Sequence, residues 1–165
     1  MKKLLYLAGV ALVATLLLGA CSKSDDGESN ENEGQKEVNW TPKEGTDVRP
    51  TWAKPTDASW MDEWPMSVQI GVQSELLPYV SNADLMCAML KDEVRAVSGL
   101  KETGGQYYFM LPIQGNSGEG LVTLKYYCDK LHRIFTVSDW KEFDSTIQPT
   151  DQGTPYVVPF FTGED

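Results

Sequence analysis

The sequence predicts an all-β protein whose folded part is a two-sheet antiparallel β-sandwich of about seven strands. Several short segments alternate apolar residues with small or polar ones, which is the pattern of strands with one buried face. Turn-forming residues separate these segments at short intervals, and helical periodicity is almost absent. We therefore expect the strands to form two layers around one core.

Residues 40–65 open the folded part and are rich in tryptophan, proline, threonine and aspartate. Pro42, Pro50 and Pro55 oppose a helix, so we expect this segment to be irregular, or to form one short edge strand, and to pack on the sandwich. A strand at 66–72 follows, because every second side chain there is apolar.

The middle of the chain predicts a hairpin and two further strands. Residues 85–90 and 94–97 are largely apolar and flank the polar residues 91–93, an arrangement typical of a β-hairpin. An aromatic-rich strand is expected at 106–113, and a glycine-rich turn separates it from a strand at 121–128.

The last third predicts two more strands and one helical turn. A two-residue turn at Asp129-Lys130 leads into a strand at 131–137, and residues 138–143 are expected to form a single helical turn with a Ser or Asp cap. Residues 156–158 form a closing strand, which the prolines on either side of it favour as an edge strand.

Residues 1–20 have the organisation of a cleaved signal peptide. Lys2 and Lys3 precede an apolar run at 4–18, and Leu18-Gly19-Ala20-Cys21 is similar to the lipobox of bacterial lipoproteins. That resemblance implies that Cys21 becomes the lipid-modified N-terminus, so the membrane is a partner through acyl chains. A transmembrane helix is the weaker alternative, because about 20 apolar residues are needed to cross a bilayer.

Residues 21–39 are expected to be a disordered acidic tether, because they carry six acidic side chains and almost no aliphatic ones. The stretch Ser22-Lys23-Ser24-Asp25-Asp26 resembles the export signal that sends Bacteroidetes lipoproteins to the outer face of the outer membrane. We therefore expect display toward the cell exterior, with a generic linker and a periplasmic location as the alternative.

The net charge argues against nucleic acid as a partner. The chain has 14 basic and 24 acidic side chains, a formal charge of -10. Removal of the leader takes Lys2 and Lys3, which leaves 12 basic against 24 acidic side chains and a charge of -12. Phosphates would be repelled by such a surface.

Four segments in the body of the chain, residues 66–165, carry a resemblance: 84–97, 106–111, Gly115-Asn116 and 122–127. Through them, residues 66–161 or so resemble an immunoglobulin-like sandwich domain of Bacteroidetes surface lipoproteins. The resemblance implies the fold and the location, but the family has no assigned chemistry. Where many members carry Cys-Arg-Gly after the hairpin, this chain has Val94-Arg95-Ala96, so no role of that cysteine is carried over.

Candidate catalytic residues are scarce, and we expect no enzyme, no metal site and no cofactor. His132 is the only histidine, which excludes a two-histidine zinc site. It lies in the strand predicted at 131–137, on the solvent face, and no motif supplies a partner for acid–base work. Asp84, Asp92 and Glu93 could offer oxygen ligands to calcium, but no spaced loop supports such a site.

Cys87 and Cys128 leave two alternatives. An even pair in an oxidising compartment is a candidate disulfide, and it would stabilise the fold by about 4 kcal/mol through loop closure. Equally, two buried free thiols can act as small hydrophobic side chains.

Four tryptophans crowd into the segment 40–65 and are the strongest functional signal. Trp40 and Trp52 are the candidate ligand-binding residues, since an exposed indole among carboxylates and amides can stack on a sugar ring. Trp60 and Trp64 are expected to act as staples that hold the segment on the sandwich, because their neighbours lead directly into the first strand.

These observations predict a surface-displayed outer-membrane lipoprotein that acts as a non-catalytic binding module, for a glycan or for an outer-membrane protein. The alternative is an accessory or adhesive subunit that binds a partner protein through a sheet edge. Asp144-Ser145-Thr146 also resembles the O-glycosylation signal of Bacteroidetes envelope proteins, which makes Ser145 a candidate modification site.

Overall fold

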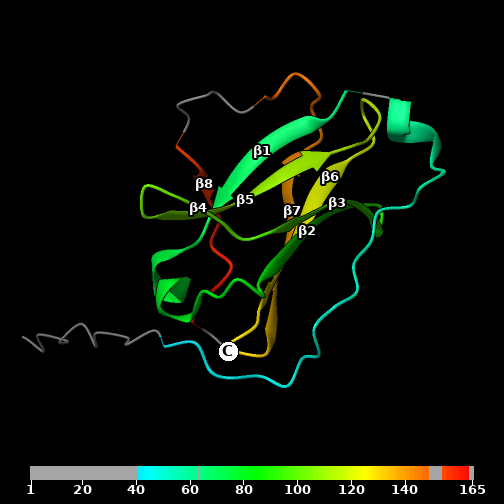
Figure 1. Cartoon of the computed structure of the whole chain (residues 1–165). Coiled ribbons are helices and arrows are strands. Elements are labelled where there is room, and N and C mark those ends of the chain that lie inside the picture. The colour runs from blue at the N-terminus through cyan, green and yellow to red at the C-terminus, as the bar shows by residue number, and fades with distance from the viewer. Residues whose placement is uncertain (1–40, 63, 149–153, 164–165) are drawn as a thin grey trace, which may run out of the picture. The chain divides into compact units, whose positions relative to one another are not determined.

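The computed structural model describes residues 41–62, 64–148 and 154–163, which form two four-stranded sheets packed together (Figure 1). The predicted all-β sandwich is confirmed, with eight described strands instead of about seven. Cys21, the tether and Trp40 lie outside the described residues. The strands are β1 (Met66–Gly71), β2 (Leu85–Leu90), β3 (Glu93–Gly99), β4 (Lys101–Thr103), β5 (Gln106–Ile113), β6 (Leu121–Cys128), β7 (Arg133–Glu142) and β8 (Tyr156–Val157).

The strand order is that of an immunoglobulin-like sandwich. One sheet has the order β4-β5-β1-β8 and the other β3-β2-β6-β7, and the chain crosses between sheets after β1, β3, β5 and β7. With β1 taken as strand B, these orders correspond to D-E-B-A and C′-C-F-G. The place of the first strand is filled by β8, which runs parallel to β1.

The core lies between the sheets and follows the predicted period of two. In β1 the side chains of Met66, Val68 and Ile70 are fully buried while the intervening residues are half-buried. An aromatic cluster continues the core toward the end of the sandwich that holds the β6–β7 turn, with ring centroids 5.4 to 6.4 Å apart. Its members are Phe109, Tyr126, Phe135, Phe160 and Phe161.

Two predictions for the last third of the chain are wrong. Residues 138–143 form no helical turn, since β7 runs to Glu142 and pairs with β6 through a register shift opposite Thr123. Asp139, at φ 52, sits in this irregularity. His132 lies in the turn before β7, at φ 47, and not in a strand. Pairing with β6 overrides the local capping signal at 138–143, whereas His132 is left out of the strand because the β6–β7 turn has four residues, 129–132, and not two.

Residues 41–58, here called the strap, are irregular as expected and contain no strand. The strap is held at the β6–β7 turn, where Gly45 N–H donates to Leu131 O and Asp47 N–H donates to His132 O, both at 2.7 Å. Further along, the Arg49 guanidinium donates to Ala83 O. The short 3-10 helix η1 (Ser59–Asp62) then leads toward β1.

A second 3-10 helix, η2 (Ser74–Tyr79), connects β1 to β2 and was not predicted. All described residues belong to one compact unit, Val38–Asp165. Among the described residues no helix has the length and apolar character needed to span a bilayer.

Candidate functional site

The candidate site lies at the end of the sandwich where β5 and β7 end and β6 begins. Two loops meet there, residues 114–120 between β5 and β6, and residues 143–148 after β7. Phe143 N–H donates to Gly120 O at 3.0 Å and joins the two loops directly. We refer to this region as the loop end.

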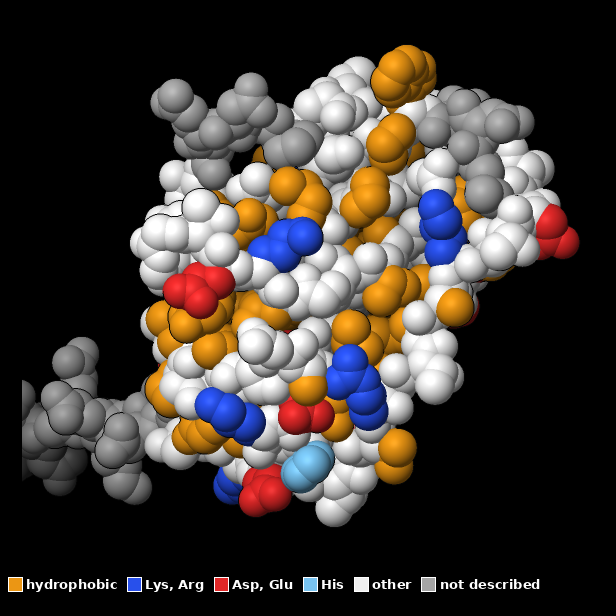
Figure 2. All heavy atoms as spheres, in the orientation of Figure 1, with side chains coloured by type: hydrophobic (Ala, Val, Ile, Leu, Met, Phe, Trp, Pro, Cys, Tyr) orange, Lys and Arg blue, Asp and Glu red, His pale blue; other side chains and the backbone are white. Residues whose placement is uncertain are grey.

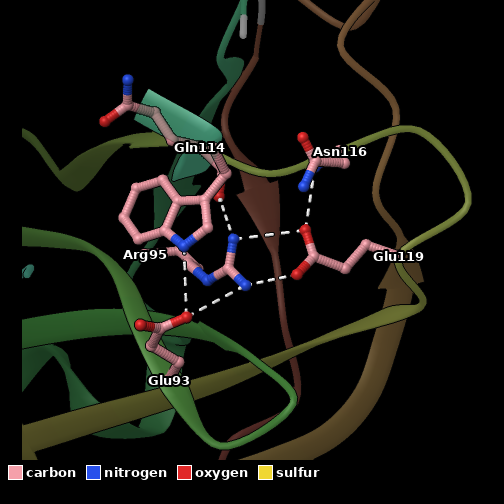
Figure 3. Close-up of polar contacts among 6 residues, drawn as sticks. Glu93, Arg95, Gln114, Asn116 and Glu119 are labelled. Carbon is pink, nitrogen blue, oxygen red and sulfur yellow. Dashed lines mark hydrogen bonds and ion pairs between the residues drawn. The ribbon is translucent and has the colours of Figure 1, made fainter. Parts of the chain in front are cut away.

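Arg95 is the buried support of the loop end (Figure 3). The β2–β3 pairing shifts register between Ala88 and Met89, which leaves Arg95 as the extra residue of a β-bulge. A bulge redirects the side chain that it carries, and here only 3% of the Arg95 side chain is exposed. The sequence pattern alone gave no sign of this bulge.

Three polar groups and one ring surround the guanidinium. Glu119 accepts from both terminal nitrogens of Arg95, one of these bonds being 3.2 Å long, and Gln114 O accepts at 3.3 Å. Glu93 lies 3.2 Å from the same guanidinium, and the Trp60 ring centroid lies 4.3 Å from its central carbon. The Nε of Arg95 is buried with no partner among the described residues.

Trp60 completes the cluster and confirms one predicted staple. Its side chain is 4% exposed, and its indole N–H donates to Glu93 Oε2 at 3.1 Å. The helix η1, which follows the strap, is therefore tied to the loop end through a cation–π contact and a charge-assisted hydrogen bond.

The loop 114–120 is shaped by Glu119. Its carboxylate accepts from Asn116 N–H at 2.8 Å, and its own N–H donates to Asn116 O at 3.1 Å. Burial raises the pKa of Glu119, but the Asn116 amide and the Arg95 guanidinium outweigh that effect and hold the pKa below its ordinary value. Glu119 is thus ionised at neutral pH and fixes the loop in one conformation.

The second loop is fixed by local turns and by the start of β1. Asp144 Oδ1 accepts from the backbone N–H of Thr146 at 2.9 Å and from its hydroxyl at 2.6 Å. Ile147 O accepts from Ser67 N–H at 2.9 Å, and the Gln148 amide donates to Pro65 O at 2.9 Å. These bonds place the residues before β1 beside the loop.

A groove of about 620 Å³ runs between the two loops. Serine and threonine hydroxyls, two exposed carboxylates and one ammonium group are found among its lining side chains. Trp64 directly precedes the Pro65 that bonds to Gln148, and its side chain is 79% exposed. The lining residues are Ser117, Gly118 and residues 141–147.

The exposure of Trp64 corrects the second predicted staple. Trp60 already covers Arg95, and strand pairing begins only at Met66, so no regular structure carries the Trp64 ring onto the core. Trp52 is half-buried in the strap. Ser145 is half-buried in the groove wall, and its carbonyl accepts from Gln148 at 3.1 Å.

Of the two alternatives for the cysteines, the structure shows the free thiols, because Cys87 and Cys128 are both unbridged and buried. Cys87 lies opposite Lys125 in the β2–β6 pair, three residues from Cys128 along the strand. An odd offset puts the two side chains on opposite faces of the sheet, and a disulfide cannot bridge that arrangement.

Comparison with known proteins adds no identity. No protein-family model, curated protein or solved structure matches the chain. The resemblance to surface lipoproteins therefore stays a prediction, and the proposed function depends on the residues of the loop end.

Proposed function

We propose that this protein is a lipoprotein of the outer membrane, anchored through acylated Cys21 and displayed at the cell surface, whose sandwich is a non-catalytic glycan-binding module. The leader and the acidic tether support the location. The observation that carries the binding function is the exposed Trp64, next to the Pro65 that bonds to the loop 143–148, together with the polar groove that this loop lines.

A sugar ring fits such a surface because it has two kinds of face. Its C–H face stacks on an aromatic ring, while its hydroxyls need hydrogen-bond partners. Trp64 offers the ring, and Ser117, Thr146 and Glu142 offer hydroxyl and carboxylate groups along the groove. Both walls are held by the hydrogen bonds described above, so little order has to be gained on binding.

Assembly through a sheet edge is less well supported. The outer strands β4 and β8 have three and two residues, and β7 is interrupted by the irregularity at Asp139. Short, bulged or charged edges oppose strand addition. Figure 2 shows hydrophobic side chains spread among polar atoms on the face viewed there, without one continuous apolar patch.

Affinity electrophoresis tests the binding function. Soluble neutral polysaccharides, namely starch, mannan, xylan and a mixed-linkage β-glucan, are cast into native gels, and the chain beginning at Ser22 is run through each. We expect retardation in at least one gel, and Trp64→Ala should weaken it by about tenfold or more. Trp52→Ala is run beside it because Trp52 is the other predicted ligand-binding residue in the described part of the chain; it should migrate like the wild type, and loss of retardation in that variant alone would place binding on the strap.

Equal retardation of the Trp64→Ala variant would exclude the groove as the binding surface. The location is tested separately by metabolic labelling with palmitate and by protease treatment of intact cells. The palmitate label should be lost in the Cys21→Ser variant. If added protease fails to digest the protein on intact cells, surface display is contradicted.

A further inference from the structure

The end of the sandwich opposite the loop end holds a second candidate site. Two cavities open there, of about 210 and 420 Å³, and both are lined by Tyr107 of β5. Tyr107 has the same strand parity as the buried Phe109 and Leu111, so it faces the interior at the open end of the core. Together the cavities fall in the size range of small-ligand sites.

The smaller cavity is apolar. Val72, Leu77, Pro155 and Val157 contribute to its walls. Leu77 and Val157 are 41% and 65% exposed, so their side chains leave apolar surface at the mouth of this cavity. An aliphatic group of a ligand would cover both.

The larger cavity is polar and carries both signs of charge. Asn82, Glu102 and Lys130 line it, and none of their side chains forms a hydrogen bond or ion pair with another described residue. Glu102 lies directly opposite Tyr107 in the β4–β5 pair, so the two side chains share the inner face of that hairpin. Lys130 comes from the β6–β7 turn on the other side.

The walls of the polar cavity are held together from beneath by Asp84. Its buried carboxylate accepts from Ser81 N–H at 3.2 Å, from Asp129 N–H at 2.9 Å and from the Tyr126 hydroxyl at 2.8 Å. These bonds tie the segment of Asn82 to the turn of Lys130. Such support keeps a site in its binding geometry before a ligand arrives.

We propose that this end of the sandwich binds a short zwitterionic peptide with an aliphatic side chain. Glu102 would receive the α-ammonium group, Lys130 the α-carboxylate, and the apolar cavity the side chain, with Tyr107 between them. Unpaired charges of opposite sign in one cavity suit a ligand that carries both charges, which a neutral sugar does not.

Isothermal titration calorimetry with leucyl-leucine tests the proposal, using the chain beginning at Ser22. We expect saturable binding that weakens at least tenfold with glycylglycine, which lacks the aliphatic side chains, and with N-acetyl-leucinamide, which lacks both charges. Free leucine is a further arm, and tighter binding of leucine than of the dipeptide would overturn the peptide assignment.

Variants locate the site. Glu102→Gln and Lys130→Gln should each weaken leucyl-leucine at least tenfold. Lys101→Gln, on the outer face of the same strand, is the matched control and should leave the affinity unchanged, as should Trp64→Ala at the other end. Absence of saturable binding at millimolar peptide, or equal binding by the Glu102→Gln and Lys130→Gln variants, would overturn the proposal.

Discussion

Arg95 is a buried cation, because only 3% of its side chain is exposed. Its guanidinium forms ion pairs with the carboxylates of Glu93 and Glu119. Desolvation of three charged groups is costly, and their attraction offsets that cost only while all of them keep their hydrogen bonds. Loss of one partner therefore leaves a buried charge uncompensated. The loop end should be sensitive to single substitutions and to acid.

We expect Glu119→Gln to lower the free energy of unfolding by about 2 kcal/mol at neutral pH. Because the folded-state pKa of Glu119 lies below its ordinary value of 4.5, the unfolded chain takes up the proton first as the pH falls. The stability that the carboxylate contributes is therefore present above pH 4.5 and lost as the pH falls toward the folded pKa.

Urea unfolding between about pH 3 and pH 7 measures this contribution. The difference in free energy of unfolding between the wild type and Glu119→Gln should become smaller in acid. Glu44 is exposed, so the Glu44→Gln control should match the wild type at every pH. A gap of constant size across the titration would contradict the role of the ionised carboxylate.

The two buried cysteines should be chemically inert in the native state. Burial raises the pKa of Cys87 to about 12 and also raises that of Cys128, so neither thiol ionises near neutral pH. In the chain beginning at Ser22, we expect no reaction with a thiol reagent until denaturant is added, and then two thiols per chain. Fewer than two in denaturant without reductant would indicate the disulfide after all.

Removal of one hydrogen-bond donor to the Asp84 carboxylate should lower the free energy of unfolding by a measurable amount. Burial raises the pKa of this carboxyl, and hydrogen bonds from Asp129, Tyr126 and Ser81 only partly oppose that effect. Tyr126→Phe takes away the hydroxyl donor, and we expect a loss of about 1 to 3 kcal/mol in denaturant unfolding. An unchanged unfolding midpoint would show that water replaces the hydroxyl.

Single residues were the least predictable level from sequence. The exposure of Trp64 and the burial of Trp60 differ, although both precede β1 in similar polar surroundings. What separates them is Arg95, and its position depends on a bulge in a pair of strands elsewhere in the chain. No local pattern contains that information.

At the level of elements, the loop 114–120 depends on close packing. A Cβ at Gly115 would lie 2.7 Å from Leu90 Cδ1, 3.1 Å from Glu119 and 3.3 Å from Phe143. Leu90 is buried in the core and has little room to move. This glycine is needed for the close approach of the loop to β2.

We expect Gly115→Ala to destabilise the protein by about 1 to 3 kcal/mol. Gly99→Ala is the matched control, because no atom lies within 4 Å of a Cβ at that position, and it should be neutral or slightly stabilising. Thermal unfolding of the two variants makes the comparison. Equal melting temperatures would show that the loop can shift away from the core.

Strand prediction succeeded where an apolar run was bounded by turn residues and failed where pairing was decided by a neighbour. The bounds of β5 and β6 agree with the sequence prediction, since each is an eight-residue run rich in apolar and aromatic residues with turn-forming residues beside it. β4 has three exposed residues and carries no such pattern. The far half of β7 looked like a capped turn locally, and only its hydrogen bonds to β6 make it a strand.

At the level of the whole molecule, the strap is a distinct contributor to stability. Deletion of residues 22–37 should leave the melting temperature unchanged, because the compact unit begins at Val38. Further deletion to Ser59 removes the bonds of Gly45 and Asp47 to the β6–β7 turn and should lower the melting temperature by about 5 °C or more. Scanning calorimetry measures both, and equal values for the two deletions would assign the strap no stabilising role.

The position of β8 has a consequence for how the chain reaches its folded state. Ile70 and Tyr156 must meet to complete one sheet, and β8 follows every other described strand in the chain. A polypeptide that is being synthesised would thus expose the edge of β1 until this distant segment arrives. Pairing across so long a separation is slow, so this edge of the sheet should be covered late in folding.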